Sequence, residues 1–278
     1  MLRTIAAASI AMLAAGAVLA ACPEPAAVDA LVQSYMTGEP AAALMAGAPM
    51  EDALCAQGML VERLAPTLGT AVGYKAGLTS PAMQERFGLG EPVHGVLLAG
   101  MMLADGATVP AAFGARPIVE ADLLLVVGDA AINAATTPEE ILAGLSSVRP
   151  FIELADLVVA EGEPFDGSVI TAINVGARMG VMGADVAVTP EMAEALAGMT
   201  VTLGPKEGEP LSEAPGAAIL GNPLNAIAFL TGAGIELKPG DLVSAGSFGA
   251  PQQPQAGQTL VARYVGLPGD PSVSVTFE

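Results

Sequence analysis

The spacing of apolar residues divides the chain into a helical beginning and a strand-rich remainder. Apolar positions at helical spacing predict helices over residues 28–36 and 50–64. From about Ala71 onward, short β-branched and aliphatic runs bounded by Gly and Pro replace that spacing. These runs predict strands over residues 118–127, 169–175, 200–203, 242–248, 260–265 and 273–277.

Two more helices are predicted between these strands. Thr137-Pro138-Glu139-Glu140 has the form of an N-cap, a proline and a first turn of acids, and predicts a helix to about Ser147. Asn222-Pro223 predicts another over 223–231. Strands outnumber helices without regular βαβ alternation, which disfavours a doubly wound nucleotide fold. We predict one α+β domain, with a helical N-terminal arm at 22–70 and a core at 71–278.

Residues 1–21 are typical of an export signal. A single basic residue, Arg3, precedes an apolar run that ends in small residues before Cys22-Pro23. The run is only marginally long enough to span a bilayer, so an uncleaved membrane anchor is the alternative. We therefore predict that the rest of the chain works outside the cytoplasm.

Cys22 leaves two processing routes open. Leu19-Ala20-Ala21-Cys22 resembles the lipobox of bacterial lipoproteins, in which the cysteine is acylated. Val18-Leu19-Ala20 equally suits secretion of a soluble protein, in which Cys22 could pair with Cys55, the only other cysteine. The first route predicts a lipid-anchored protein and the second a soluble periplasmic one. Membrane contact is expected only if Cys22 is lipidated.

Composition narrows the possible partners. Hydrophobic residues make up 53% of the chain and charged residues 14%, which supports a substantial core. Ten Lys and Arg against 29 Asp and Glu give a net charge of −19, the wrong sign for binding phosphate backbones. The chain has no Trp and 4% aromatic residues, so a base-stacking surface is also disfavoured. We therefore expect no nucleic-acid partner.

Three acidic residues in apolar runs are candidate metal ligands. Glu120 and Asp122 alternate along the predicted strand 118–127 and therefore share one face, and Glu153 lies in a second apolar run. Carboxylates on an apolar strand need protonation, a cationic partner or a metal ion. Oxygen ligands without a nearby imidazole or thiol suit Mg²⁺, Mn²⁺ or Ca²⁺. The alternative is that Glu120 and Asp122 occupy the wet face of an edge strand.

Three other polar residues are candidates for the chemistry. Lys75 stands among glycines in Gly73–Gly77, where it is either a pocket ammonium or a solvated turn lysine. His94 is the only histidine, so any imidazole chemistry depends on it, although a turn histidine is often structural. Ser247, in Gly246–Gly249, could present a hydroxyl to an anion or simply end a strand.

The order of these motifs resembles the 2-keto-4-pentenoate hydratase family of the fumarylacetoacetate hydrolase superfamily. The resemblance runs from about Ala26 to the C-terminus. It rests on the segments GYKAGLTSPAM (73–83), PVHG (92–95), DGATVP (105–110), PIVEADLLLVV (117–127), FIEL (151–154), Asn174, GNPLNA (221–226) and SAGSF (244–248). It implies a β-rich roll of mixed sheets, a homo-oligomer, and Mg²⁺ or Mn²⁺ bound by Glu120, Asp122 and Glu153.

The resemblance also implies roles for single residues and a class of reaction. The family's lysine falls on Lys75 and its glycine-serine loop on Ser247, which makes Lys75 a catalytic candidate and Ser247, with Asn174, a substrate-binding one. His94 is the second catalytic candidate, because it is the only imidazole available as a base. The implied activity is a metal-dependent lyase that hydrates 2-hydroxy-2,4-dienoic acids, with small 2-oxo acids as the substrate class. A 2-oxo acid decarboxylase, an acylpyruvate hydrolase and an exported binding protein without turnover are the alternatives.

Three departures from the family pattern favour the alternative without turnover. Asp122 replaces the second acid of a usual Glu-x-Glu. Val93 replaces an aspartate in a usual Pro-Asp-aromatic-Gly, where His94 takes the aromatic place. Ile173 precedes Asn174 where relatives often have aspartate.

Overall fold

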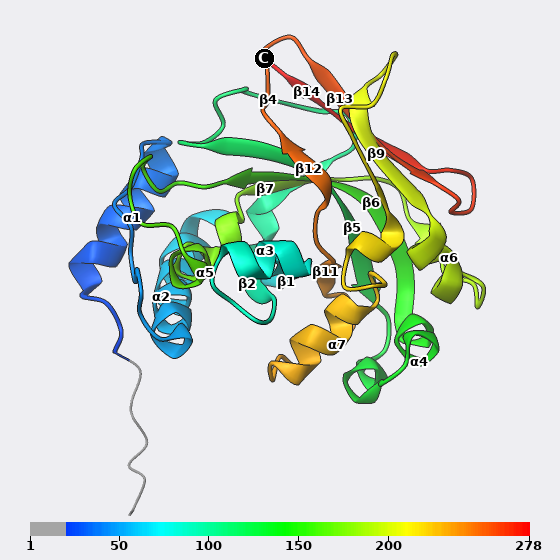
Figure 1. The fold of residues 1–278 in the computed structure, drawn as a ribbon, viewed down its shortest axis with the longest axis horizontal. Coiled ribbons are helices and arrows are strands. Elements are labelled where there is room, and N and C mark those ends of the chain that lie inside the picture. The colour runs from blue at the N-terminus through cyan, green and yellow to red at the C-terminus, as the bar shows by residue number, and fades with distance from the viewer. Residues whose placement is uncertain (1–20) are drawn as a thin grey trace, which may run out of the picture.

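The computed structural model describes residues 21–278, and within that range the strands form two sheets, of nine and five strands (Figure 1). The large sheet contains β1 (Ala71–Gly77), β2 (Val93–Leu98), β3 (Met102–Ala104), β5 (Pro117–Val127), β6 (Leu145–Asp156), β7 (Met179–Met182), β8 (Val186–Ala187), β11 (Leu242–Ser244) and β12 (Phe248–Gln252). The small sheet contains β4 (Ala107–Val109), β9 (Thr200–Pro205), β10 (Ser212–Pro215), β13 (Thr259–Val265) and β14 (Ser272–Phe277).

Both sheets mix parallel and antiparallel pairs. The large sheet runs β2-β1-β11-β5-β6-β7-β3, with β12 also paired to β5 and β8 to β6, and the small sheet runs β10-β9-β13-β14-β4. In the large sheet β1 pairs in parallel with β11, whereas β5 is antiparallel to both β11 and β6. The predicted α+β class with mixed sheets is confirmed.

Helices cover the large sheet from two directions. They are α1 (Pro25–Thr37), α2 (Met50–Leu68), α3 (Pro81–Arg86), α4 (Pro138–Ala143), α5 (Gly167–Ala172), α6 (Met192–Gly198) and α7 (Asn225–Gly232). Short 3₁₀ turns occur at η1 (Ala99–Met101), η2 (Ala130–Ala134), η3 (Asn174–Gly176) and η4 (Gly216–Ala218). Figure 1 shows α1, α2 and α5 grouped at one side of the sheet and α4, α6 and α7 at the other.

The two faces of β5 belong to two different hydrophobic cores. Leu123 and Leu125 pack between the two sheets, in a core that α4, α6 and α7 also line. Leu124, which points the other way, packs in the core formed with α1, α2 and α5. The helices of the predicted N-terminal arm therefore cover the face of β5 that carries the even-numbered residues, which include Glu120 and Asp122.

Two predicted elements are wrong. Residues 169–175 form α5 and η3 instead of a strand: the Asp166 carboxylate accepts hydrogen bonds from the Ser168 and Val169 amides, which starts a helix, and burial of the β-branched residues stabilises it. The helix predicted from 138 to about Ser147 stops at Ala143, because β6 begins at Leu145 and pairs along the whole of β5. In both segments, strand pairing or burial outweighs the local secondary-structure propensity of the residues.

The predicted strand 242–248 is interrupted at Gly246. β11 ends at Ser244 and β12 starts at Phe248, so residues 245–247 form a loop beside β5. Gly246 has φ 125°, and a Cβ built there would lie 2.6 Å from the Thr79 hydroxyl oxygen. The loop can therefore take this shape only with glycine at this position.

A disulfide joins Cys22 to Cys55 on α2, with their Cα atoms 5.4 Å apart. Next to it, the Ala21 amide donates to the Asp52 carboxylate at 2.7 Å. The predicted export signal lies outside the described residues, except for Ala21. Among residues 21–278, no helix is both long and apolar enough to cross a bilayer.

Reduction of this disulfide should destabilise the fold by about 3 kcal/mol, because closing a loop of this size restricts the unfolded chain. The two cysteines are 33 positions apart. The measurement is urea unfolding of the oxidised protein with and without dithiothreitol, with the double variant Cys22→Ser/Cys55→Ser as a control that should not respond to the reductant. Equal midpoints for oxidised and reduced protein would contradict the prediction.

Candidate active site

Strand pairing brings the three candidate carboxylates to one face of the large sheet. Glu120 on β5 lies directly opposite Glu153 on β6, and residues paired in this way project to the same side. Asp122 is two positions further along β5 and shares that side. Because β5 lies inside the sheet and Asp122 is 0% exposed, the alternative of a wet edge strand is wrong.

Lys75 reaches the same face from β1. Lys75 pairs with Ser244 on β11, which in turn pairs with Leu124 on β5, so the lysine projects toward the carboxylates. Its ammonium forms a buried ion pair with Glu153 and donates to the Val175 carbonyl at 2.9 Å. Lys75 is 3% exposed, so it is not a solvated turn lysine.

The loop after β11 supplies the remaining polar contacts. The Ser247 hydroxyl donates to Glu120 at 2.7 Å, and the Gly246 amide donates to Asp122 at 3.0 Å. The Ser244 hydroxyl also donates to Asp122. Ser247 therefore lies at the site, although its partner here is a site carboxylate.

The site carries more negative charge than its single lysine balances. Burial, reinforced by the charge of Glu153, raises the pKa of Glu120 above its usual range, although Ser247 and Lys75 act to lower it. The same two causes raise the pKa of Asp122 to about 8, despite its hydrogen bonds from Ser244, Leu123 and Gly246. Asp122 therefore holds a proton near neutral pH unless a further cation is present.

The donor atoms fit a hard divalent cation only in part. Glu120 and Glu153 face each other across two strands, and the hydrogen bonds within residues 21–278 use one oxygen of each. Asp122, by contrast, has both oxygens hydrogen-bonded. Consistent with this, no group of three Asp, Glu, His or Cys residues in the described chain is arranged to hold a metal ion.

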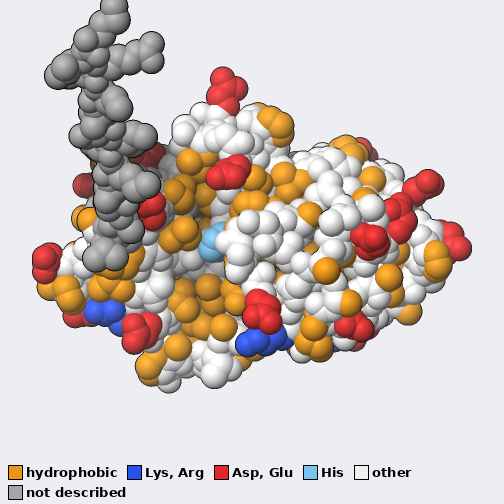
Figure 2. All heavy atoms as spheres, turned by 90° about the horizontal axis from the view of Figure 1, so that it is seen from below, with side chains coloured by type: hydrophobic (Ala, Val, Ile, Leu, Met, Phe, Trp, Pro, Cys, Tyr) orange, Lys and Arg blue, Asp and Glu red, His pale blue; other side chains and the backbone are white. Residues whose placement is uncertain are grey.

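His94 is not brought together with the other candidates. On β2, Gly95 pairs with Lys75 and projects to its side, whereas His94 pairs with Ala76 and projects to the opposite side, where its ring lies 6.4 Å from that of Phe229 on α7. Burial lowers the pKa of His94, so its imidazole is neutral near pH 7. Figure 2 shows the single histidine at the surface among apolar side chains.

The side chain of Asn174 forms hydrogen bonds with the backbone of β2. Its amide group accepts from the Val96 amide at 2.7 Å and donates to the Val96 carbonyl at 2.9 Å, which clips η3 onto β2. A Cβ at Gly95 would lie 2.8 Å from the Asn174 carbonyl oxygen and 3.2 Å from the Lys75 side chain, so this close approach requires glycine. Asn174 therefore positions the segment whose Val175 carbonyl binds Lys75.

The sequence analysis did not single out Tyr264, whose hydroxyl contacts the backbone of the strands that carry the site. Tyr264 extends from β13 of the small sheet and is 0% exposed. Its hydroxyl contacts the Asp122 carbonyl and both the amide and the carbonyl of Phe151, at the β5–β6 seam. Its only sequence signal was its place in an apolar strand, which does not distinguish a core tyrosine from this one.

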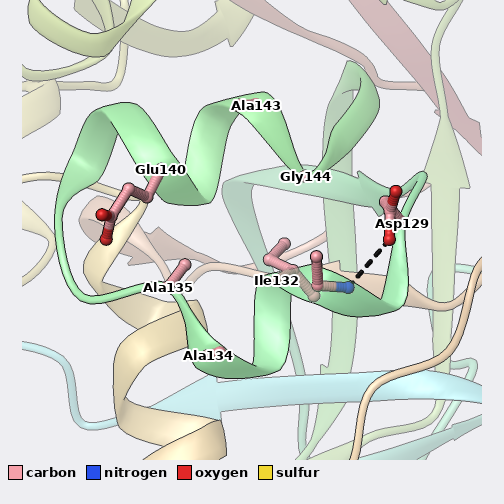
Figure 3. Close-up of a pocket in the computed structure, with 8 residues that line it drawn as sticks. Asp129, Ile132, Ala134, Ala135, Glu140, Ala143 and Gly144 are labelled. Atoms are coloured by element: carbon pink, nitrogen blue, oxygen red, sulfur yellow. Dashed lines mark hydrogen bonds between the residues drawn. The ribbon is translucent and has the colours of Figure 1, made fainter.

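The two most pronounced surface pockets of the described residues do not include the candidate site residues. One, of about 360 Å³, is lined mainly by alanines of η2 and α4 together with Asp129 and Glu140 (Figure 3). Both acids already serve the backbone, since Asp129 caps η2 and Glu140 closes the capping box of α4. The physical case for chemistry rests on the carboxylate face, where charge is buried, and not on this hollow.

Comparison with solved structures establishes the class of fold. The chain superposes on 4-oxalocrotonate decarboxylase from Pseudomonas putida G7, complexed with magnesium and adipate, with a TM-score of 0.79 at 24% identity. The match covers 91% of this chain and 97% of that one. Fumarylpyruvate hydrolase from Pseudomonas aeruginosa, with Mn²⁺ and pyruvate, gives a TM-score of 0.53 at 17% identity over 74% of this chain and 89% of that one. The described residues therefore share the fold of these two proteins.

Sequence relatives identify the family within that class. A 2-keto-4-pentenoate hydratase from Paraburkholderia xenovorans is 31% identical over 231 residues, 80% of this chain and 84% of the relative. One from Paraburkholderia phymatum is 33% identical over 202 residues, 70% of this chain and 75% of the relative. No family model matches the chain. On these relatives, the chain belongs to the 2-keto-4-pentenoate hydratase family.

Without a divalent cation, the stability of the fold should fall as the pH rises from 5 to 8. The folded state keeps a proton on Asp122 up to a pKa of about 8, whereas the ordinary value is 3.8. Between these values the folded state binds more protons than the unfolded one, so raising the pH favours unfolding. We expect the Tm of chelator-treated protein to drop by about 5 °C over this range, and added Mg²⁺ at pH 8 to reverse the drop.

The variant Asp122→Asn is the control for this titration. It removes the titrating carboxyl, so its Tm should depend less on pH than that of the wild type. A wild-type Tm that rises or stays level between pH 5 and 8 would contradict the raised pKa.

Proposed function

We propose that the protein is a divalent-cation-dependent hydro-lyase that adds water to a small 2-hydroxy-2,4-dienoic acid to form a 4-hydroxy-2-oxo acid. The observation that carries this proposal is the cross-strand pair Glu120–Glu153 with Lys75 on the same buried face. The relatives named 2-keto-4-pentenoate hydratase support the choice of reaction.

Mg²⁺ or Mn²⁺ held by Glu120 and Glu153 would supply the positive charge that stabilises negative charge on the oxo oxygen of the substrate. Lys75 adds a second positive charge, and its ammonium is the proton-bearing group in contact with Glu153. Ser247 orients Glu120 through its hydrogen bond. His94 is left out of the chemistry, because it projects from the other face of β2.

The charge at the site favours a monocarboxylate substrate. Among the described residues, Lys75 is the only Lys or Arg that contacts Glu120, Asp122 or Glu153. Val93 lies on the same face as Lys75, is 4% exposed, and adds an apolar surface beside Gly77 and Val175. A second substrate carboxylate would find no cation there, which disfavours a dicarboxylate and hence decarboxylation. The loss of a polar group at Val93 also favours the alternative of a binding protein without turnover.

The test is a substrate panel on chelator-treated protein with Mg²⁺ or Mn²⁺ restored. Ultraviolet absorbance follows the loss of 2-hydroxypenta-2,4-dienoate, and the dicarboxylate oxalocrotonate and an acylpyruvate serve as competitors. We expect cation-dependent loss of the monocarboxylate dienoate. Release of CO₂ from the dicarboxylate would instead indicate a decarboxylase, cleavage of the acylpyruvate a hydrolase, and cation binding without any turnover a binding protein.

We also propose that the protein works outside the cytoplasm as a soluble homo-oligomer. The export signal predicted from the sequence and the Cys22–Cys55 disulfide support an oxidising compartment. Intact mass of protein made through its native export route separates the two processing routes: a mature chain lighter by two hydrogens indicates the disulfide, and a lipid adduct on Cys22 the anchor. Sedimentation velocity measures the subunit number.

A further inference from the structure

Asp122 accepts more hydrogen bonds from the protein than either of the other two site carboxylates. Its Oδ2 accepts from the Ser244 hydroxyl, and its Oδ1 accepts from the Gly246 amide at 3.0 Å and from the Leu123 amide. The side chain is 0% exposed. Glu120, in contrast, is partly exposed and accepts one hydrogen bond, from Ser247.

Turning Asp122 toward a cation would leave buried donors without partners. Ser244, at the end of β11, and Gly246, in the loop that follows it, are both buried. Each buried donor that loses its acceptor makes the turned state less favourable, because water cannot replace the lost bond there. Glu120 and Glu153 each retain one carboxylate oxygen that these hydrogen bonds do not use.

We propose that Asp122 is not a ligand of the cation but a positioning residue, which anchors the loop Ser244–Ser247 to β5 and so holds the Ser247 hydroxyl on Glu120. The proposal rests on the cation-dependent function proposed above. It assigns direct cation binding to Glu120 and Glu153 and gives Asp122 a separate task. The anchor acts at both ends of the loop, since Asp122 contacts Ser244 at its start and Gly246 directly before Ser247.

Packing on the other side of the loop shows why the anchor matters for Ser247. The Thr79 side chain packs against Gly246, and the Asp122 carboxylate accepts a hydrogen bond from the Gly246 amide. Without Asp122, the hydrogen bond from the Ala245 amide to the Leu123 carbonyl and the contact with Thr79 remain, but Gly246, directly before Ser247, loses its bond to β5. The Ser247 hydroxyl would then no longer stay within hydrogen-bonding distance of Glu120.

Mn²⁺ is the probe that tests this assignment, with its dissociation constant measured by electron paramagnetic resonance of the free ion. Asp122→Asn keeps an acceptor for the Gly246 amide and removes only the carboxylate charge, so we expect its Kd for Mn²⁺ to stay within about fivefold of wild type, whereas Glu120→Gln, which removes a proposed ligand, should weaken Mn²⁺ binding by at least about fiftyfold. Equal weakening by the two variants would overturn the proposal and make Asp122 a ligand.

The anchor is tested separately by hydrogen exchange of the amides of residues 245–249 without any metal. Asp122→Ala should speed this exchange at least about tenfold. Ser244→Ala leaves the carboxylate in place and removes one of its two loop contacts, so it should speed the exchange as well. It is the second variant in case Asp122→Ala does not fold. Asp122→Asn should leave the exchange near wild type. Unchanged exchange in the folded Ala variants would overturn the anchor.

The two measurements also separate this inference from the proposed function. A wild-type protein that does not bind Mn²⁺ would defeat the cation site of the proposed function and the ligand assignment together. The exchange experiment would still decide whether Asp122 anchors the loop.

Discussion

Replacement of Glu153 by glutamine is expected to lower turnover of a dienoate by about a thousandfold, or about 4 kcal/mol. Glu153 faces Glu120 across the two strands and holds Lys75, so the substitution removes a proposed cation ligand and the partner of the ammonium at once. The shape of the side chain is conserved. The measurement is kcat/KM on 2-hydroxypenta-2,4-dienoate at saturating Mn²⁺.

The matched control for this prediction is Glu161→Gln, which makes the same change at an exposed position. Its turnover should equal that of wild type, and both variants should give native circular dichroism. Turnover of Glu153→Gln within tenfold of wild type would show that the carboxylate face is not the reaction site.

Replacement of Lys75 by methionine is expected to affect both stability and turnover. The ammonium is buried against Glu153, so its removal leaves a buried carboxylate without its partner and should destabilise the fold by about 3 kcal/mol. Turnover should fall at least about tenfold, because the positive charge at the proposed substrate site is lost. Urea unfolding and steady-state kinetics at one pH measure the two effects.

The double variant Lys75→Met/Glu153→Gln separates these effects. Neutralising both partners removes the uncompensated charge, so stability should return toward that of wild type, whereas turnover should stay low. Recovery of turnover in the double variant, or wild-type kinetics in Lys75→Met alone, would restrict Lys75 to a structural role.

Local pattern was sufficient where a property depends on neighbours in the sequence. The alternation of β5 placed Glu120 and Asp122 on one face, and the helical spacing near the N-terminus located α1 and α2. Local pattern failed for residues 169–175, because their β-branched side chains fit either a strand or a buried helix, and only the cap from Asp166 and the surrounding core select the helix.

The sequence by itself determined which residues could carry charge in an apolar setting: three acids, one lysine among glycines and a single histidine. The tertiary structure alone decided which of them meet. Lys75 and Glu153 are 78 positions apart, and Ser244 reaches Asp122 across 122 positions. Strand register brings these distant residues into contact and also places the His94 side chain on the opposite face from Lys75. The physical reason is that side-chain alternation fixes a face only within one strand, whereas pairing between distant strands decides which faces coincide.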